Sequence, residues 1–240
     1  LAGVPMLTPT RALKEYFLKK YCGRLNHGSI TIVPPSFDAT LFTPRPSGKP
    51  DHSMAMRIAV QADQLLTSDL KSFLNGFESW LRADGIRQGE VEMTIFGDGA
   101  SAVAERTAKS PLRKFLVVDA CGSLVEQLDY SRKSDIFCLV LGQSAASTCI
   151  VPDRLVDALG MGGPLCGILP DGAASSLLRE AGGWVAPAGD HAAITELFRS
   201  VAASWRDHTL AGPSNELIRS YDVGVVIPEL TRAIAIQHVS

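Results

Sequence analysis

Segments typical of strands alternate with segments typical of helices over most of this chain, and no other feature restricts its fold as strongly. Short apolar runs such as "IFCLVLG" are separated by amphipathic helical stretches from Met56 onward. The clearest helical stretch has apolar side chains at positions i, i+3, i+4, i+7 and i+11, namely Leu70, Phe73, Leu74, Phe77 and Leu81. Such alternation is typical of βαβ units with right-handed crossovers. It predicts an α/β fold with a doubly wound, Rossmann-like parallel sheet of about six strands, covered on both faces, from roughly Met56 to Trp205.

The first part of the chain reads as one helix followed by one strand. The stretch "TRALKEYFLKKYCG" predicts a helix capped by Thr10, and "SITIVPP" predicts a strand that the two prolines terminate. The segment Thr43–Ser53 is rich in Pro, Gly and Ser, which is typical of a linker. We therefore expect the strand Ile30–Val33 to pair outside the main sheet.

Composition excludes several classes of protein. The chain is 46% hydrophobic and 20% charged, which is ordinary for a globular protein, and its net charge of −2 implies no broad basic face for nucleic acid. No apolar run reaches the roughly 18 residues that a membrane span needs, although a short amphipathic face could still make peripheral membrane contact. The histidines are scattered without HxxxH or HExxH spacing, so we expect no metal site.

The cysteines indicate a reducing environment. Their number, five, is odd and none forms a CxxC pair, which argues against a disulfide framework or a zinc site. We therefore expect free thiols and a cytoplasmic location. The chain opens at "LAGVP" without a methionine or a visible signal peptide, so we expect it to be a portion of a longer polypeptide.

Two strand-to-helix turns are candidates for a ligand site, because ligands bind beyond the carboxyl ends of parallel strands. In "LPDGAASS", the small residues Gly172, Ala173 and Ala174 would let backbone N–H groups approach an anion at a helix N-terminus. The same residues also suit an ordinary helix start, and this turn alone does not separate the two interpretations. Gly97 in "FGDGA" resembles half of a dinucleotide fingerprint, but the third glycine is absent and a glycine-containing tight turn is the favoured interpretation.

A charged pair follows in the predicted helix "PDRLVDALGM". The carboxylate of Asp157 could accept two hydrogen bonds from a ribose diol, and Arg154 lies one turn earlier. Most helix carboxylates are simply solvated, which is the favoured interpretation of Asp157 taken alone, and the two residues at i and i+3 would then form only a surface ion pair.

The order of these pieces resembles the C-terminal core of the retaining GT-B glycosyltransferases called glycosyl transferases group 1. That family reads P-x-K-L-x-E-Y-x-A-x-G-x-P-V, then a strand, a glycine-containing turn, a helix ending E-x-G-x-G, and V-x-P-x-D. The matching residues, in order, are Pro152, Arg154, Leu155, Asp157, Gly162, Pro164, Gly182, Gly183, Val185, Pro187 and Asp190. Upstream, "ITIVPPSFDATLFTP" resembles the family's junction between its two Rossmann halves.

The resemblance implies an organisation and a function. Residues 1–43 would be the tail end of an acceptor-side domain, 44–53 a linker, 54–208 a Rossmann-like nucleotide-sugar-binding domain and 209–240 a C-terminal helical segment. The donor half of a hexosyltransferase-like enzyme would then bind a nucleotide diphosphate sugar as substrate, without a cofactor. The N-terminal acceptor domain of the same polypeptide would be its partner. Donor-binding residues would be Lys71, Gly97, Arg154, Asp157, Gly172, Ala173 and Ala174, whereas no catalytic residue is assigned.

Two departures from the family pattern concern charge. Cys149 stands where the family has the first glutamate of an acidic pair, and the first turn of the domain carries Asp63 and Asp69, with Lys71 in place of the usual Arg and Lys. We therefore expect Arg154 and the Gly172 turn to hold the diphosphate. A Gly172→Val change should block backbone approach and weaken binding by about tenfold or more, and it should leave folding intact unless φ is positive. A degenerate, non-catalytic Rossmann module that binds a nucleotide or a partner protein is the main alternative, and a nucleotide-sugar epimerase of the same shape is a third.

Overall fold

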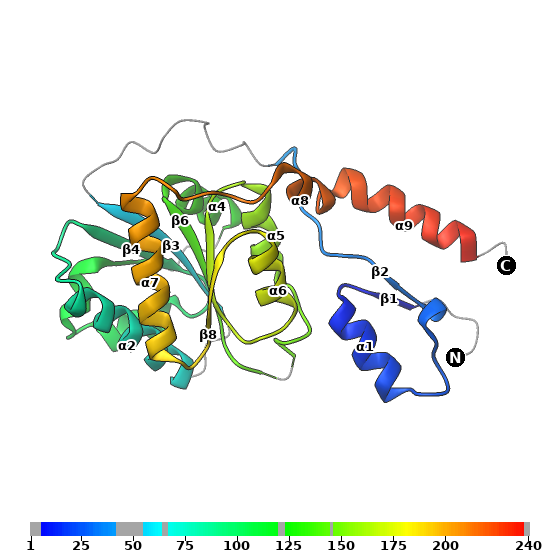
Figure 1. The fold of residues 1–240 in the computed structure, drawn as a ribbon, viewed down its shortest axis with the longest axis horizontal. Coiled ribbons are helices and arrows are strands. Elements are labelled where there is room, and N and C mark those ends of the chain that lie inside the picture. Colours follow the sequence, from blue (N-terminus) through cyan, green and yellow to red (C-terminus); the bar gives the residue numbers. More distant parts are fainter. Residues whose placement is uncertain (1–5, 42–54, 64–66, 120–122, 145, 238–240) are drawn as a thin grey trace.

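The computed structural model describes residues 6–41, 55–63, 67–119, 123–144 and 146–237. Its main body is a parallel sheet between two layers of helices, and a smaller unit at the N-terminus lies beside it (Figure 1). The predicted linker, residues 44–53, lies outside the described residues. None of the helices in the described part is both long and apolar enough to cross a membrane.

The main sheet has six parallel strands in the order β5-β4-β3-β6-β7-β8. The strands are β3 (Met56–Asp63), β4 (Val91–Phe96), β5 (Leu116–Val118), β6 (Ile136–Leu141), β7 (Leu165–Leu169) and β8 (Trp184–Pro187). Numbered within the sheet, this order is 3-2-1-4-5-6, which is the Rossmann order. The doubly wound parallel sheet predicted from the sequence is therefore confirmed.

Helices cover both faces of the sheet, because alternate residues of its strands point to opposite sides. In β3, Ile58 and Val60 belong to the core under one helix layer, whereas Ala59 belongs to the core under the other. The first layer contains α2 (Thr67–Ala83), α3 (Ala100–Thr107) and α7 (His191–Arg206), together with the 3₁₀ helix η2 (Pro111–Phe115). The second contains α4 (Leu124–Lys133), α5 (Asp153–Gly160) and α6 (Ala173–Glu180).

The N-terminal unit forms its own two-stranded parallel sheet. It consists of β1 (Met6–Thr8), α1 (Arg11–Lys20), the 3₁₀ helix η1 (His27–Ser29) and β2 (Ile30–Ile32). Strand β2 pairs with β1 and not with the main sheet, as we expected. The sequence did not predict β1, since three residues are too few to show a period. Thr10 caps α1 by accepting a hydrogen bond from Leu13 N at 3.1 Å, which confirms the predicted helix start.

The C-terminal segment crosses the chain that leaves β2. Helices α8 (Asn215–Ser220) and α9 (Val223–Gln237) follow α7. Phe37 N donates to Tyr221 O at 3.0 Å, and Val223 N donates to Phe37 O at 2.9 Å. The Phe37 ring is buried and lies against Gly160 at the end of α5. We call this crossing of residues 37 and 221–223 the junction.

Candidate functional site

The strand order places a topological switch point between β3 and β6, where the chain winds in opposite directions. A buried carboxylate spans it. Asp69, in the first turn of α2, is 5% exposed and accepts a hydrogen bond at 3.1 Å from the backbone N–H of Gln143, which follows β6. Asp69 therefore holds the loop after β6 in place, which gives the acidic first turn a structural role.

Removing this carboxylate should loosen the loop. We expect Asp69→Ala to lower the free energy of unfolding by about 1–2 kcal/mol, because the bond has a charged acceptor. Asp69→Asn keeps one acceptor oxygen and should cost less. Urea denaturation of both variants checks the order, and equal losses would contradict a role for the hydrogen bond.

The predicted anion-binding turn at Gly172 already uses part of its hydrogen-bonding capacity. Gly172 N donates to the Ser175 hydroxyl at 2.9 Å, and Ala173 N donates to Thr148 O at 2.9 Å. Two of the N–H groups at the start of α6 are thus bonded within the protein. A phosphate at this turn would have to use the remaining donors or displace these bonds.

The structure also changes what a substitution at Gly172 means. Its φ of 164° is extended and suits any residue, but an added Cβ would lie 2.2 Å from Thr148 O. The expectation that Gly172→Val leaves folding intact is therefore wrong. Gly172 is needed because the loop after β6 passes directly over it.

Arg154 and Asp157 form an ion pair on α5. Arg154 Nη1 lies 3.0 Å from Asp157 Oδ2, and the two side chains are 33% and 16% exposed. Burial raises the pKa of the Asp157 carboxyl above its ordinary value, while the Arg154 guanidinium opposes the shift. Arg154 is thus already paired with Asp157. The donor-binding role of both residues stays a prediction.

The other predicted site residues lie apart from one another. Gly97 adopts a φ of 96° in the turn after β4, which favours glycine. Lys71 has an exposed side chain in the first helical turns of α2. Ala174 is buried in the core beside α6, so only its backbone could face a ligand. Their part in donor binding stays a prediction.

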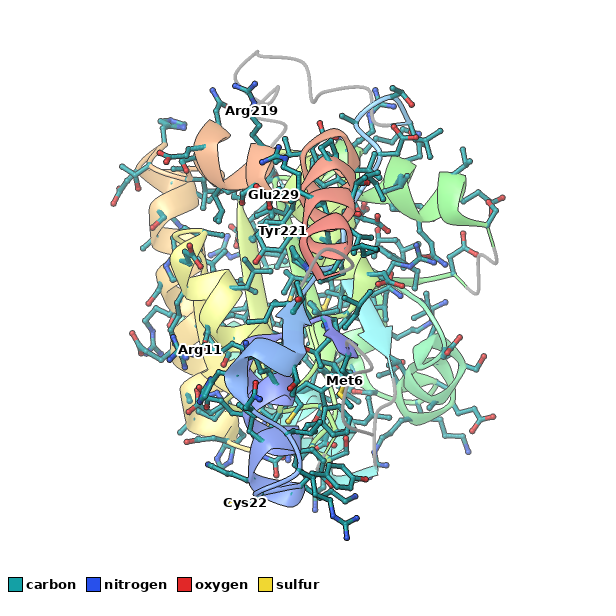
Figure 2. All side chains as sticks on the ribbon, turned by 90° about the vertical axis from the view of Figure 1, so that its right-hand side faces the viewer. Met6, Arg11, Cys22, Arg219, Tyr221 and Glu229 are labelled. Carbon is teal, nitrogen blue, oxygen red and sulfur yellow. The ribbon has the colours of Figure 1, made fainter. Side chains whose placement is uncertain are left out.

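A cavity of about 520 Å³ separates the N-terminal unit from α6. Both this unit and the segment from Arg219 to Glu229 lie on the same side of the main body (Figure 2). We call the cavity the cleft; its lining residues come from three parts of the chain and include Thr10, Arg11, Glu15, Ala173, Ser176, Leu177, Glu180 and Tyr221. Of the predicted site residues, only Ala173 lines it.

A hydrogen bond ties the start of α1 to the loop after β6. The hydroxyl of Thr10 donates to Cys149 O at 2.5 Å, and the next carbonyl upstream, that of Thr148, accepts from Ala173 N. The first turns of α1 and α6 therefore meet the same loop. This places one end of the cleft at the carboxyl edge of the main sheet.

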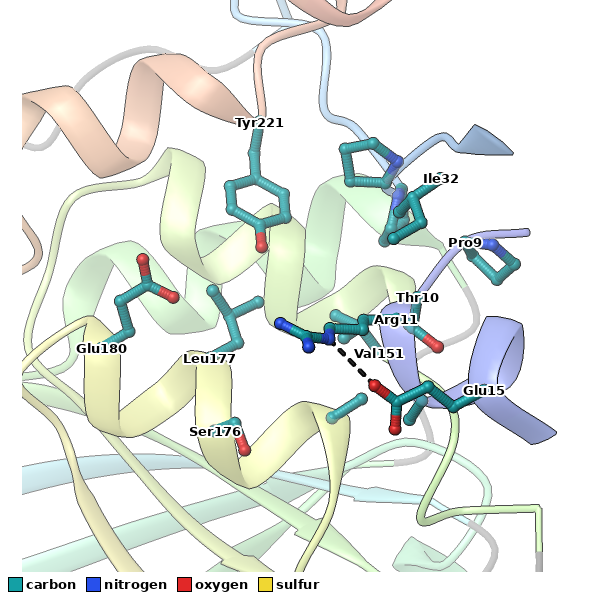
Figure 3. A pocket seen from close by; sticks show the side chains of 14 residues that line it. Pro9, Thr10, Arg11, Glu15, Ile32, Val151, Ser176, Leu177, Glu180 and Tyr221 are labelled. Carbon is teal, nitrogen blue, oxygen red and sulfur yellow. Dashed lines mark hydrogen bonds and ion pairs between the residues drawn. The ribbon is translucent and has the colours of Figure 1, made fainter. Parts of the chain in front are cut away.

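Charged side chains enter the cleft from both walls (Figure 3). Arg11 comes from α1 and pairs with Glu15, Nε to Oε1, at 3.0 Å. Glu180 comes from the end of α6, and burial together with the Glu180 charge raises the pKa of Tyr221. None of these four side chains was predicted as a site residue. The pair of Arg11 and Glu15 reads in the sequence as an ordinary surface ion pair of one helix, and only the folded chain brings it near Glu180 and Tyr221.

The described residues do not form a metal-binding cluster. Among them, no group of three or more His, Cys, Asp or Glu residues could hold a metal ion.

No model of a known protein family matches the sequence, and no curated protein matches it either.

Solved structures nevertheless share the fold. A glycosyltransferase from Rickettsia africae has a TM-score of 0.71 at 11% identity over 97% of this chain. Anabaena HepE, solved with UDP-glucose, has a TM-score of 0.68 at 12% identity over 98%. The pneumococcal O-GlcNAc transferase GtfA, solved with UDP and GlcNAc, has a TM-score of 0.63 at 14% identity over 98%.

These neighbours are GT-B glycosyltransferases, so the chain has the fold of the C-terminal part of a GT-B architecture. The chain spans 63%, 64% and 45% of the length of the three proteins, respectively.

Proposed function

We propose that this chain is the donor-binding part of a glycosyltransferase that takes its sugar from a nucleotide diphosphate sugar and retains anomeric configuration. The base and ribose would lie toward α5 and Asp157, and the diphosphate near the start of α6. The acceptor would be held mainly by an N-terminal domain of the same polypeptide. No metal or cofactor enters this proposal.

One observation carries the proposal: the main sheet has the Rossmann order, and one end of the cleft lies at its carboxyl edge, where the loop after β6 and the start of α6 contribute Val151 and Ala173. Ligands of open parallel sheets bind at that place. Transfer of the sugar from a nucleotide diphosphate sugar leaves negative charge on the departing nucleoside diphosphate. Preorganised hydrogen-bond donors at this edge would stabilise that charge. Structural neighbours solved with UDP or UDP-glucose support the same ligand class.

Acidic side chains favour a second candidate, a degenerate module that binds a nucleotide or a partner protein without catalysis. Glu15 and Glu180 both line the cleft, against Arg11 as the single cation among its described lining residues. Cys149 occupies the position where the resemblance leads us to expect a glutamate. Measured donor hydrolysis or transfer would separate this candidate from an active enzyme.

Calorimetric titration of the purified chain with UDP, GDP and ADP tests the proposal. We expect one of them to bind, and Asp157→Asn to weaken that binding by about tenfold, because a ribose diol would lose part of its charged acceptor. Binding of none of the three would contradict the proposed function. Unchanged affinity in Asp157→Asn would contradict a ribose position beside α5.

The stability of Asp157→Asn provides the control. A raised native pKa means that the folded state binds more protons than the unfolded state, so the carboxylate makes stability fall as pH rises above about 4. At about pH 7 the variant should thus melt at the wild-type temperature or higher, and this advantage should vanish near pH 4. A lower melting temperature at pH 7 would show that the ion pair outweighs the burial of the charge.

A further inference from the structure

We infer that Arg11 is the cation that binds the diphosphate group, supplied from the N-terminal side of the cleft in place of a basic pair on the main body. This inference rests on the proposed function for the identity of the ligand. It assigns a binding role to a residue of the small N-terminal unit.

Two arginines of the main body, one on α5 and one on α6, are already paired. Arg154 pairs with Asp157 at 3.0 Å, and Arg179 pairs with Asp171 at 3.1 Å. The N–H groups of Gly172 and Ala173 also donate within the protein. The groups that the sequence suggested for the diphosphate are therefore largely occupied.

Arg11 is positioned by its neighbour in the sequence. Thr10 anchors the start of α1 to Cys149 O, while Thr148 O contacts the start of α6. Arg11 follows Thr10 directly, so its side chain begins beside the carboxyl edge of the main sheet. Figure 3 shows it extending from α1 into the cleft, toward the wall of α6 that carries Leu177.

The guanidinium of Arg11 is available to an anion. Its side chain is 85% exposed, and its ion pair with Glu15 engages Nε. Neither of its two Nη groups makes a hydrogen bond or an ion pair with another of the described residues. A guanidinium fork with free Nη donors suits the oxygens of a diphosphate.

Glu15 then acts as a competing anion. Its carboxylate holds Arg11 Nε and adds negative charge to the same cavity. Removing that charge should strengthen the binding of a diphosphate, whereas removing Arg11 should weaken it. Opposite changes in affinity at two positions one turn apart on the same helix would not follow from a loss of packing, since the two side chains are 85% and 49% exposed.

Calorimetry of the full chain with UDP, at low and high salt, tests this inference. We expect Arg11→Ala to bind UDP about tenfold more weakly and with less dependence on salt, and Glu15→Gln to bind it up to a few fold more tightly. Arg24→Ala is the matched control, because Arg24 is an exposed arginine of the same unit that does not line the cleft. All three variants should melt at the wild-type temperature.

Wild-type affinity in Arg11→Ala, or weaker binding in Glu15→Gln, would overturn the role of Arg11 and leave the proposed function standing. If the wild-type chain binds no nucleoside diphosphate, inorganic pyrophosphate serves as the probe. Pyrophosphate binding that Arg11→Ala abolishes would uphold the inference while the proposed function fails. Binding of neither probe would overturn both.

Discussion

Asparagine in place of Gly172 should destabilise the protein, although the rules for helix capping predict the reverse. Gly172 is the N-cap of α6, a position where asparagine is as good as or better than glycine by a few tenths of a kcal/mol. Any Cβ there would lie 2.2 Å from Thr148 O and 2.7 Å from Thr148 Cα. We expect the contact to dominate and to lower the free energy of unfolding by about 1–3 kcal/mol.

The same change at the other end of α6 is the control. Gly182 has a φ of 75° and open space around it, and asparagine tolerates this left-handed conformation. Gly182→Asn should therefore change stability by less than about 0.5 kcal/mol. Urea denaturation measures both variants. A Gly172→Asn protein as stable as wild type would show that the loop after β6 can move away from α6 at little cost.

Displacement of the loop after β6 should also change the shape of the cleft. Thr148 precedes Cys149, whose carbonyl accepts the hydrogen bond from Thr10. We therefore expect Gly172→Asn to weaken nucleotide binding as well as folding. Binding that survives intact in the folded fraction would place the ligand away from the start of α6.

Loss of the Phe37 ring should have the largest effect on stability. The ring is 4% exposed and contacts Gly160 so closely that a Cβ there would lie 2.6 Å from Phe37 Cδ2. Truncation of a buried phenylalanine costs about 3–5 kcal/mol, so Phe37→Ala should lower the free energy of unfolding by that amount. Chemical denaturation provides the measurement.

The position of Phe37 makes its effect informative. Its backbone bonds to Tyr221 and Val223 hold the C-terminal segment at the junction, and Tyr221 lines the cleft. Hydrogen exchange in α8 and α9 should thus rise in Phe37→Ala. Leu41→Ala is the control, because Leu41 is 70% exposed and should cost less than about 0.5 kcal/mol. Equal effects of the two changes would contradict the packing role of Phe37.

Much of the fold could be predicted because its signals are local. Strand β6 is buried along all six of its residues and reads as an unbroken apolar run. Asp190 caps α7 by accepting hydrogen bonds from Ala192 N and Ala193 N at 3.0 Å each, and a residue of that type before a helical pattern is a recognisable start. Strand β1 was missed because three residues show no period and its partner, β2, is distant in the sequence.

The site was less predictable, since a residue type does not reveal which groups are already bonded. Asp69 looked like an acidic residue opposed to phosphate, yet it is buried and bonded to Gln143 N. Arg154 looked available for a diphosphate, yet it is paired with Asp157. Arg11 carried no motif and reads in the sequence as an ordinary surface residue at a helix start.

The sequence by itself determined the order of strands and α-helices from β3 to α7, the helix starts at Thr10 and Asp190, and the Rossmann character of the main sheet. These follow from periodicity and from contacts within a few residues of the chain. Only the tertiary structure decided that Thr148 O takes the N–H of Ala173 and that Thr10 anchors α1 at Cys149. It also decided which charges face the cleft, because such contacts join segments far apart in the sequence and exist only once the chain has folded.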